Sequence, residues 1–285
     1  EGVLALLSDS TNVEVEGYTV SEQEVARNLG KVITAAKGRV IVALFASNVF
    51  RIQQVIDIAV SNNRKVIFNG RSMEQIISIA DELGYIHHPP HTIMDIKQIN
   101  KVPDNQVVII TTGSQGEPMS ALARMATGIH KHINIKQGDS VILSSKYIPG
   151  NEKAIANIIN RLYRRGAEVI YSKVAQIHAS GHAHQEELKL MLNLTKPRYF
   201  IPVHGEYRHL VVHARLAEKL GMPRENVLVA EDGKVIAFDR DGGRLEGQVH
   251  TGRILVDGKG IGDVGRSVLK ERRELSEGGL VVVTM

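Results

Sequence analysis

Residues 39–60 of the chain read RVIVALFASNVFRIQQVIDIAV. After Arg39, the rest of the first seven form an apolar run with several β-branched side chains, which is typical of a strand buried on both faces. After the polar turn at Ser47 and Asn48, apolar residues recur every three or four positions, as they do along one face of a helix. The stretch therefore predicts a strand that leads directly into an amphipathic helix.

The same strand-then-helix unit recurs between residues 20 and 175. Apolar runs that we expect to be strands occupy residues 39–45, 65–68, 106–111, 139–144 and 167–171. Amphipathic segments that we expect to be helices occupy residues 22–36, 49–60, 73–83, 119–127 and 153–164. Strands that alternate with helices in this way form a parallel sheet with helices on both faces. The predicted fold class is therefore α/β.

Beyond residue 175 the pattern changes. A strand at residues 199–203 is expected between helices at 185–194 and 207–220. Short strands separated by turns that contain Asp and Gly are expected at residues 227–230, 235–238, 254–256 and 280–283. This pattern indicates a largely antiparallel layer of a second domain. We therefore expect residues 21–175 to form one domain, and residues 1–20 and 176–285 to form parts of another.

The composition excludes several classes of protein. The chain has 285 residues and no cysteine, which excludes a disulfide scaffold, thiolate zinc sites and a cysteine nucleophile. No apolar run approaches 18 residues, so we expect no membrane association, and the lack of cysteine fits a cytoplasmic protein. The net charge of +4 is compatible with a polyanionic partner. Because cysteine is absent, the imidazoles of the twelve histidines are the soft ligands that remain for a transition metal.

One cluster of candidate functional residues is IHASGHAH at residues 177–184. Its small residues let backbone N–H groups approach an anion, and the helix expected to follow adds a favourable dipole. His178 and His182, four residues apart, suit a phosphate or a metal-bound oxyanion, or they are simply loop histidines with local hydrogen bonds. His182 and His184 also match part of the HxHxDH zinc signature, but the final histidine is missing.

Two further clusters lie at the ends of expected strands. His204 follows the strand at residues 199–203, where open sheets commonly build their sites, and a neutral imidazole is a good zinc ligand. The alternative is a buried histidine with a hydrogen bond across the loop. Asp9 lies at the end of the strand expected to start in the apolar run at residues 3–7. A carboxylate there can orient an imidazole or bind a metal, although Asp-Ser-Thr-Asn is also an ordinary turn.

Three polar loops follow strands of the expected α/β sheet, at residues 45–48, 112–118 and 144–152. Because the carboxyl ends of parallel strands meet at one edge, we expect these loops to lie together where ligands tend to bind. Each loop is alternatively only a turn that caps a helix. None of them is a P-loop, since no G-x-x-x-x-G-K-[ST] occurs in the chain.

Taken together, these segments resemble the ribonuclease J family of bacterial β-CASP nucleases with a metallo-β-lactamase fold. The resemblance covers nearly the whole chain, and its segments occur in the order expected for the family. The matching stretches are LLSDSTN (6–12), FASNVFRIQQVI (45–56), GRSME (70–74), TGSQGEPMSALARMA (112–126), IPGNE (148–152), HASGHAHQEE (178–187), PVHGEYRHL (202–210) and DGKGIGDVG (257–265).

The resemblance implies a fold and an activity. The expected fold is a parallel-sheet β-CASP domain with helices on both faces, together with the partial C-terminal half of a metallo-β-lactamase αββα domain. The implied activity is zinc-dependent hydrolysis of RNA phosphodiester bonds, as a 5′-to-3′ exonuclease and an endonuclease, in RNA maturation and decay. Two Zn²⁺ ions per intact active site are expected, with Mg or Mn as alternatives. Expected partners are RNA and either further copies, as a dimer or tetramer, or a paralogue.

The resemblance also implies roles for three residues of the metal and phosphate chemistry. Asp9 matches the motif A acid, which is expected to orient the motif B histidine. His182 matches motif B and is expected to contact the scissile phosphate. His204 matches motif C, a ligand to one of two zinc ions.

RNA binding is implied for a further group of residues. His178, Ser180 and Gly181 lie where the family binds RNA phosphate, with Ser47 and Asn48 across the cleft. The family often has histidine where this chain has Phe50, so a phosphate contact from that position is not expected here.

The family's metal motifs 1 to 4 would precede residue 1. The chain begins at Glu1 rather than Met and ends inside an apparent strand at residues 279–285, so we expect it to be an internal piece of a longer polypeptide. A catalytic zinc needs about three protein ligands, and His204 is the one family ligand present. We therefore expect the 285 residues alone to be zinc-poor and inactive.

Two other interpretations remain open on the sequence. One is a catalytically weak, RNA-binding paralogue that acts as a scaffold subunit of a ribonuclease complex, which degraded upstream metal motifs would favour. The other is a nucleotide- or sugar-phosphate-binding α/β protein. That class predicts a GxGxxG loop, and the chain has none.

Overall fold

The computed structural model describes residues 2–148, 150–172, 174–252, 256–257, 260–261 and 265–279. By their internal contacts the residues divide into two compact units. Unit 1 comprises residues 1–14 and 188–285, and unit 2 comprises residues 15–187. Each unit is described by itself, and the domain boundaries expected after residues 20 and 175 stay a prediction.

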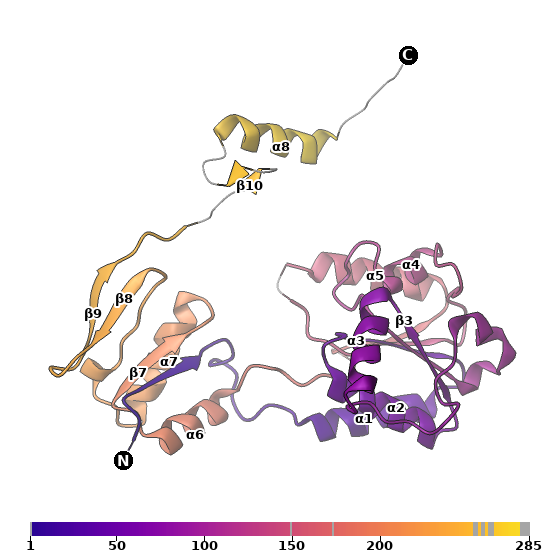
Figure 1. Ribbon diagram of the computed structural model, residues 1–285, viewed down its shortest axis with the longest axis horizontal. Helices are drawn as coiled ribbons and strands as arrows, with labels where there is room; N and C mark the ends of the chain where they lie inside the picture. The colour runs from indigo at the N-terminus through magenta and orange to yellow at the C-terminus, as the bar shows by residue number, and fades with distance from the viewer. Residues whose placement is uncertain are drawn as a thin grey trace. The chain divides into compact units, whose positions relative to one another are not determined.

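Unit 2 contains a parallel sheet with helices on both faces, which confirms the predicted fold class (Figure 1). The strand order is β3-β4-β2-β5-β6, and every pair is parallel. The strands are β2 (Val40–Ala43), β3 (Lys65–Asn69), β4 (Val107–Thr111), β5 (Ser140–Leu143) and β6 (Glu168–Ile170). The helices are α1 (Glu22–Ala35), α2 (Val49–Ser61), α3 (Arg71–Glu82), α4 (Ala121–Thr127) and α5 (Glu152–Arg164), with 3-10 turns η1 (Ile96–Lys101) and η2 (Asp104–Gln106).

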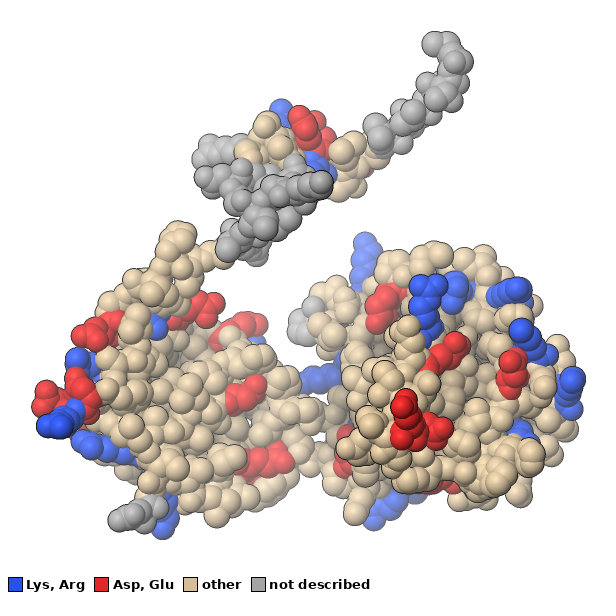
Figure 2. Space-filling model, in the orientation of Figure 1, with Lys and Arg blue, Asp and Glu red and all other residues tan. Residues whose placement is uncertain are grey.

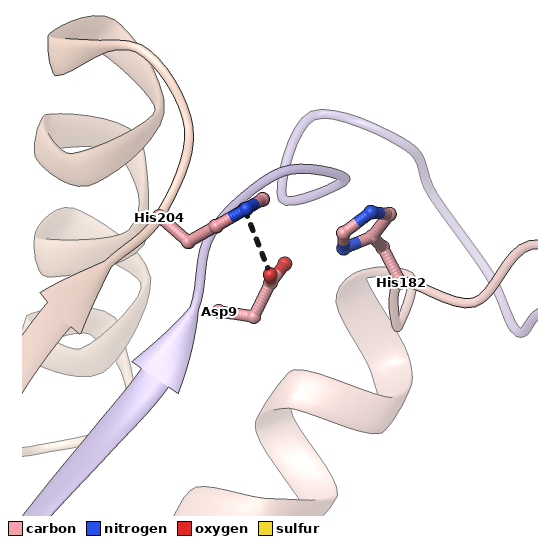
Figure 3. A group of neighbouring side chains, drawn as sticks. All are labelled: Asp9, His182 and His204. Carbon is pink, nitrogen blue, oxygen red and sulfur yellow. Dashed lines mark ion pairs between the residues drawn. The ribbon is translucent and has the colours of Figure 1, made fainter. Parts of the chain in front are cut away.

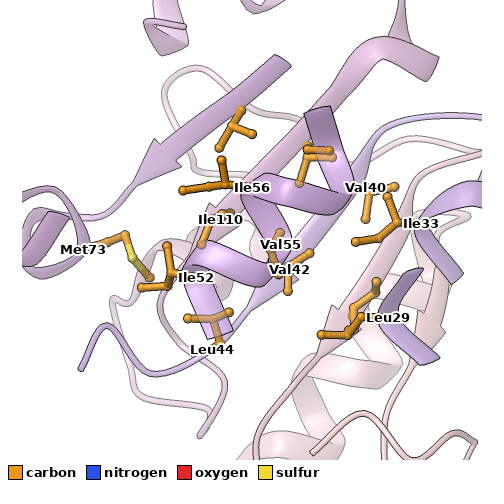
Figure 4. Close-up of a cluster of buried hydrophobic side chains, with 14 of the residues drawn as sticks. Leu29, Ile33, Val40, Val42, Leu44, Ile52, Val55, Ile56, Met73 and Ile110 are labelled. Carbon is orange, nitrogen blue, oxygen red and sulfur yellow. The ribbon is translucent and has the colours of Figure 1, made fainter. Parts of the chain in front are cut away.

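Alternate side chains of the central strand enter two different cores. Val40 and Val42 belong to the cluster that α1, α2 and α3 cover (Figure 4). Ile41 and Ala43 belong to the cluster that α4 and α5 cover. Because successive side chains of a strand point to opposite faces, a strand covered on both sides needs an unbroken apolar run. This explains why the run at residues 39–45 carries no polar alternation.

Side chains from the preceding loops begin three of these helices. The side-chain oxygens of Ser21, Asn48 and Ser120 accept hydrogen bonds from the backbone N–H three residues later. Each bond satisfies an N–H group that has no partner within its helix. The apolar spacing predicts that this helix begins at residue 119. The cap at Ser120 explains why α4 instead begins at Ala121.

The polar loops that follow β2, β4 and β5 share one edge of the sheet, as expected. The register pairs Ala43 with Thr111 on one side and with Leu143 on the other, so the three strands end at the same level. The amide of Gln115 is buried and bonds to Ser145 Oγ at 3.0 Å and to the carbonyl of Lys146 at 2.9 Å. The loops at residues 112–118 and 144–152 are therefore tied together.

A buried ion pair lies at the opposite edge of this sheet. Arg39, just before β2, donates from Nε and Nη2 to the two carboxylate oxygens of Asp139, at 2.9 and 2.6 Å. Nη2 also donates to the carbonyl of Asn134 at 2.7 Å. Both charged side chains are almost fully buried. Each therefore supplies the opposite charge and the hydrogen bonds that water supplies at the surface.

Unit 1 is built on a parallel pair of strands from distant parts of the chain. β1 (Ala5–Asp9) pairs with β7 (Tyr199–Val203) in a register that runs from Ala5 opposite Tyr199 to Asp9 opposite Val203. α6 (Gln185–Thr195) precedes β7 and starts in unit 2, and α7 (Tyr207–Lys219) follows β7. The remaining elements are η3 (Arg224–Asn226), β8 (Lys234–Phe238), β9 (Gly243–Gln248), β10 (Val256–Asp257), β11 (Gly260–Ile261) and α8 (Arg266–Gly278).

Several expectations for residues 227–283 need correction. Residues 227–230 form a single parallel bridge between Val227 and Phe200, because only the Leu228 N–H reaches the β7 backbone, at 2.8 Å. Of the strand expected at residues 254–256, only residue 256 is described, and the strand expected at 280–283 lies outside the described residues. β9 and α8 were not predicted, since their sequences contain few apolar residues.

Within the described part of the chain, no helix combines the length and the hydrophobicity that spanning a bilayer requires. On the face of unit 2 that Figure 2 shows, basic and acidic side chains are interspersed. That face therefore presents both signs of charge and not a broad basic field among the residues drawn in colour.

The buried face of α1 provides a test of this core. Leu29 is fully buried against the sheet, whereas Leu83, just after α3, is 64% exposed. We expect Leu29→Ala to lower the free energy of unfolding by about 2–5 kcal/mol, because it leaves a cavity. Leu83→Ala should change it by less than about 0.5 kcal/mol. Denaturant titration of both variants checks this, and equal losses would show that the core is wrongly placed.

Candidate functional site

Asp9 and His204 meet at the carboxyl end of the β1–β7 pair. Asp9 is the last residue of β1, and His204 is the first residue after β7. Because the two strands are parallel and in register, the residues that leave them emerge side by side. The backbone N–H of Ser10 continues the pairing by donating to the Val203 carbonyl at 2.9 Å. Figure 3 shows the two side chains facing each other, and it also labels His182 of unit 2.

Two polar contacts of Nδ1 bear on which nitrogen of His204 carries the proton. Asp9 Oδ2 lies 3.0 Å from His204 Nδ1, and Thr11 Oγ1 lies 2.7 Å from the same nitrogen. The backbone N–H of Thr11 donates to Asp9 Oδ1 at 3.0 Å and holds the carboxylate in place. A carboxylate has no proton to donate, so its contact with Nδ1 favours the form of the ring with a proton on that nitrogen. In the neutral ring the lone pair is then on Nε2, the nitrogen through which such a histidine binds metal.

The turn after β7 positions His204 through unusual backbone angles. His204 has φ 59° and Gly205 has φ 107°, both in the left-handed half of conformational space. A Cβ on residue 205 would also lie 2.9 Å from His209 Nδ1, so a side chain there is excluded twice over. His209 Nδ1 accepts from the Glu206 N–H at 3.0 Å and closes a capping box at the start of α7. The strand therefore turns sharply into the helix and leaves the imidazole at the bend.

Ser10 links this turn to a buried histidine of α7. Ser10 Oγ lies 3.0 Å from His213 Nδ1, and both side chains are fully buried. The His213 ring packs edge-on against Phe200, with centroids 4.7 Å apart, and its Nε2 has no hydrogen-bond partner. Burial lowers the pKa of His213 to about 4, although the nearby Asp9 carboxylate acts in the opposite direction. His213 is therefore a neutral support beneath the Asp9 loop.

His204 and Gly205 also line a cavity of unit 1 of about 730 Å³. Its wall includes apolar side chains such as Leu7 and Ile201, and charged ones such as Glu231 and Lys234. The imidazole at the strand end is thus accessible to a ligand from this side.

Unit 2 holds the second group of predicted residues in the loop before α6. His182 is half-buried, and its backbone N–H donates to Ser180 Oγ at 3.2 Å. Gly181 is exposed, and no atom lies within 4 Å of where a Cβ would be, so nothing in the structure requires glycine there.

The expected anion site at the N-terminus of α6 needs correction. The N–H groups of His184, Gln185 and Glu186 already donate to Glu187 Oε2, the Val15 carbonyl and the Gly17 carbonyl. These bonds leave none of the three amides for a ligand. The small residues of the loop therefore do not act through this helix terminus.

A smaller cavity of unit 2, of about 290 Å³, gathers polar side chains from the same loop. His178, Ser180, His184 and Lys146 all line it. Ser47 is exposed in the loop after β2, and Asn48 caps α2 by accepting from the Arg51 N–H at 3.1 Å. Phe50, where the resemblance led us to expect no phosphate contact, is exposed.

Three residues that the sequence did not single out shape these sites. Thr11 contacts His204, His213 supports Ser10, and Arg51 contacts His178. The clearest available signal was Arg51, a charged residue four positions before Val55 on the apolar face of the predicted helix. Nothing in the spacing of Thr11 or His213 indicated their partners, which lie about 200 residues away in the chain.

The donors at the β1–β7 edge fit a divalent metal ion. Carboxylate oxygen and imidazole nitrogen are the ligand types that zinc takes from a cysteine-free protein. A carboxylate behind the Nδ1–H of a histidine is also the usual support for a metal-binding imidazole. Unit 1 supplies Asp9 and His204 as such donors, which is fewer than the three protein ligands of a catalytic zinc.

Comparison with known proteins identifies the class to which this architecture belongs. Residues 37–162 match the family described as Ribonuclease J, beta-CASP domain. Residues 167–230 match the family described as Zn-dependent metallo-hydrolase RNA specificity domain. Strands β2 to β5 of the unit 2 sheet thus lie in the β-CASP match, and the segment that follows, which includes β6, is of the metallo-hydrolase type.

Full-length relatives agree with this class. The chain is 48% identical over 282 residues to Ribonuclease J 1 of Streptococcus pyogenes, which covers 99% of the chain and 50% of the relative. It is 49% identical over 284 residues to Ribonuclease J of Thermus thermophilus, covering 100% and 49%. It is 45% identical over 284 residues to Ribonuclease J2 of Bacillus subtilis, covering 100% and 51%. The chain belongs to the ribonuclease J family, and it spans about half the length of these curated relatives.

The neutral state of His213 predicts how stability depends on pH. An unfolded histidine has a pKa of about 6.5, whereas the pKa of folded His213 is about 4. Unfolding therefore takes up a proton below pH 6.5, so the free energy of unfolding falls as the pH drops towards 4. This one residue should account for a loss of about 2–3 kcal/mol between pH 7 and pH 4.

Unfolding of His213→Asn, measured across the same pH range, should show a correspondingly smaller loss. His250→Asn, at an exposed position of the same unit, is the control and should retain the wild-type pH dependence. An unchanged slope in His213→Asn would mean that His213 is not held neutral.

Proposed function

We propose that this chain is part of a divalent-metal-dependent ribonuclease that hydrolyses RNA phosphodiester bonds. The observation that carries the proposal is the Asp9–His204 pair at the carboxyl end of two parallel strands. It is supported by identities of 45–49% to ribonucleases J over 99–100% of the chain. The proposed activity comprises 5′-to-3′ exonuclease and endonuclease cleavage. The enzyme is proposed to associate with further copies of itself or with a paralogue, and to be located in the cytoplasm.

The metal is proposed to be zinc, two ions per complete active site, and His204 is proposed to bind one of them through Nε2. The Nδ1–H of His204, held by Asp9 and Thr11, supports this assignment because it orients the ring and raises its basicity as a ligand. A bound divalent ion would supply an activated water and polarise the phosphodiester. The other ligands would come from parts of the enzyme outside this chain.

His182 is proposed to act on the RNA itself. An imidazole can stabilise charge that develops on the scissile phosphate, or it can protonate the leaving oxygen. Asp9 is proposed to orient this ring as well, as the resemblance to the family implies. The half-buried place of His182 in a loop held by Ser180 supports a role that needs both access and orientation.

The RNA backbone is proposed to bind to polar loops of unit 2. His178, Ser180 and Gly181 would hold phosphate, together with Ser47 and Asn48 at the same edge of the sheet. These groups recognise phosphate and sugar and not base edges, so sequence preference should be weak. The interspersed charges on the face of unit 2 in Figure 2 favour such local recognition.

His182 provides the test of the catalytic role. In the intact gene product we expect His182→Ala to slow zinc-dependent RNA hydrolysis by about 10²–10⁴-fold, because a general acid or phosphate-stabilising group is lost. Single-turnover cleavage of a labelled RNA measures this, and circular dichroism monitors folding. His88→Ala, which removes an exposed imidazole of the same unit, is the matched control and should leave the rate unchanged. Wild-type turnover in His182→Ala would exclude the role, and inactive wild-type protein would favour the scaffold interpretation.

Asp9 provides a separate test of the metal role. We expect Asp9→Asn to weaken zinc binding by the intact gene product about 10- to 100-fold, because an amide is a weaker support or ligand than a carboxylate. Competition with a chromophoric chelator measures the affinity. Asp241→Asn, at an exposed position of unit 1, is the control. Equal zinc affinity in both variants would remove Asp9 from the metal site.

A further inference from the structure

Arg51 is a buried arginine at the edge of the unit 2 sheet where the polar loops meet. It lies in the first turn of α2 and is only 1% exposed. A buried guanidinium is costly unless its donors are satisfied, so its partners are informative. Its backbone N–H bonds to the cap residue Asn48, which places it directly behind the loop that follows β2.

Glu22 neutralises one side of this guanidinium. Arg51 Nη2 and Nε donate to the two carboxylate oxygens of Glu22 at 2.5 and 3.2 Å. The Glu22 side chain is 35% exposed at the start of α1, where a negative charge is also favoured by the helix dipole. This pair holds the guanidinium plane and leaves Nη1 pointing towards β5 and the loop before α6.

Nη1 connects the end of β5 to His178. It donates to the Ser144 carbonyl at 3.1 Å and lies 3.1 Å from His178 Nδ1. Arginine has no acceptor, so in this contact Nδ1 of His178 must accept. The imidazole is therefore the tautomer with its proton on Nε2, and this follows from the identity of the partner alone.

A second bond fixes the backbone next to the ring. Ser144 Oγ donates to the carbonyl of Ile177 at 2.5 Å, and both residues are buried. The peptide before His178 and its Nδ1 are thus both tied to the end of β5. The ring cannot turn over without breaking its bond to Arg51.

The other ring nitrogen is the one left for a ligand. Nε2 of His178 has no hydrogen-bond partner among the described residues, and His178 lines the 290 Å³ cavity. Burial, followed by the Arg51 and Lys146 cations, lowers the pKa of His178 to about 4. Around neutral pH the ring is therefore an uncharged N–H donor, and Lys146 lies in the same cavity wall.

We propose that Arg51 is a positioning residue that holds His178 as a neutral Nε2–H donor for a phosphate oxygen of RNA. The inference rests on the proposed phosphate-binding role of this loop. Arg51 does not touch the RNA; it determines which nitrogen of His178 carries the proton and how the ring is turned. A phosphate diester offers acceptors only, so a ring with its lone pair on Nε2 would repel it.

The tautomer can be tested in the unaltered chain. Long-range ¹H–¹⁵N correlation spectra at pH 7 distinguish a protonated from an unprotonated nitrogen in each imidazole, and the spectrum of His178→Gln assigns the signal. We expect one species with the proton on Nε2. A ring protonated on Nδ1, or a mixture of the two tautomers, would overturn the proposal.

RNA binding tests the consequence. The probe is a short single-stranded RNA labelled at its 3′ end, titrated by fluorescence anisotropy at constant salt with a chelator present to prevent cleavage. We expect Arg51→Met to weaken binding about tenfold, because a hydrogen bond to a charged phosphate is lost. Its spectrum should also show the His178 tautomers mixed.

Arg39→Met is the matched control, since Arg39 is an equally buried arginine with a bidentate carboxylate in the same unit, at the opposite edge of the sheet. It should destabilise the fold similarly but change RNA affinity less than twofold.

His178→Ala tests the phosphate-binding role separately from the positioning role of Arg51. If His178→Ala weakens binding and Arg51→Met does not, the positioning role is wrong and the phosphate-binding role stands. If His178→Ala binds RNA like the unaltered chain, the phosphate-binding role of His178 is wrong as well.

Discussion

Parallel strand pairing is the constraint on which both sites depend. When strands run in the same direction, the residues that follow them emerge at one edge, however far apart they lie in the chain. In unit 1 this brings Asp9 beside His204 at 3.0 Å. In unit 2 it brings the loops after β2, β4 and β5 to one level. Without this strand pairing, these polar segments would not be brought together.

Both sites add a polar contact that favours one protonation state of a histidine. At His204 the partner is a carboxylate, so the proton faces Asp9 on Nδ1 and the lone pair lies on Nε2. At His178 the partner is a guanidinium, so Nδ1 accepts and the proton lies on Nε2. The same side chain thereby presents a lone pair on Nε2 in one place and an N–H on Nε2 in the other, as the proposed metal and phosphate roles require.

The two buried arginines of unit 2 show why an ion pair alone does not indicate function. Arg39 and Asp139 lie at the edge where strands begin, and all their partners are structural. Arg51 makes a similar fork with Glu22, but its remaining amino group reaches a histidine that lines a cavity. The difference lies in what the third contact touches. It cannot be recognised from charge or burial.

Local patterns in the sequence were sufficient for most elements. The apolar residues within 39–45 predicted a doubly covered strand, and in the structure each side chain of residues 40–44 belongs to one of the two cores. The helix cap at Ser21 could also be predicted from the sequence, since it depends on two residues only three positions apart. The strand predicted at residues 227–230 is wrong, because this apolar run forms a single bridge. Strand β9 left no signal, because its polar residues are exposed on both faces.

The sequence by itself determined the α/β class, the family resemblance and the candidates Asp9, His178, His182 and His204. Only the tertiary structure decided that Asp9 and Thr11 both contact Nδ1 of His204, and that Arg51 contacts His178 while Ser144 bonds to the peptide before it. It also showed that the N-terminal amides of α6 are already bonded. The physical reason is range: propensity and periodicity act over a few residues, whereas these hydrogen bonds join atoms brought together only by packing.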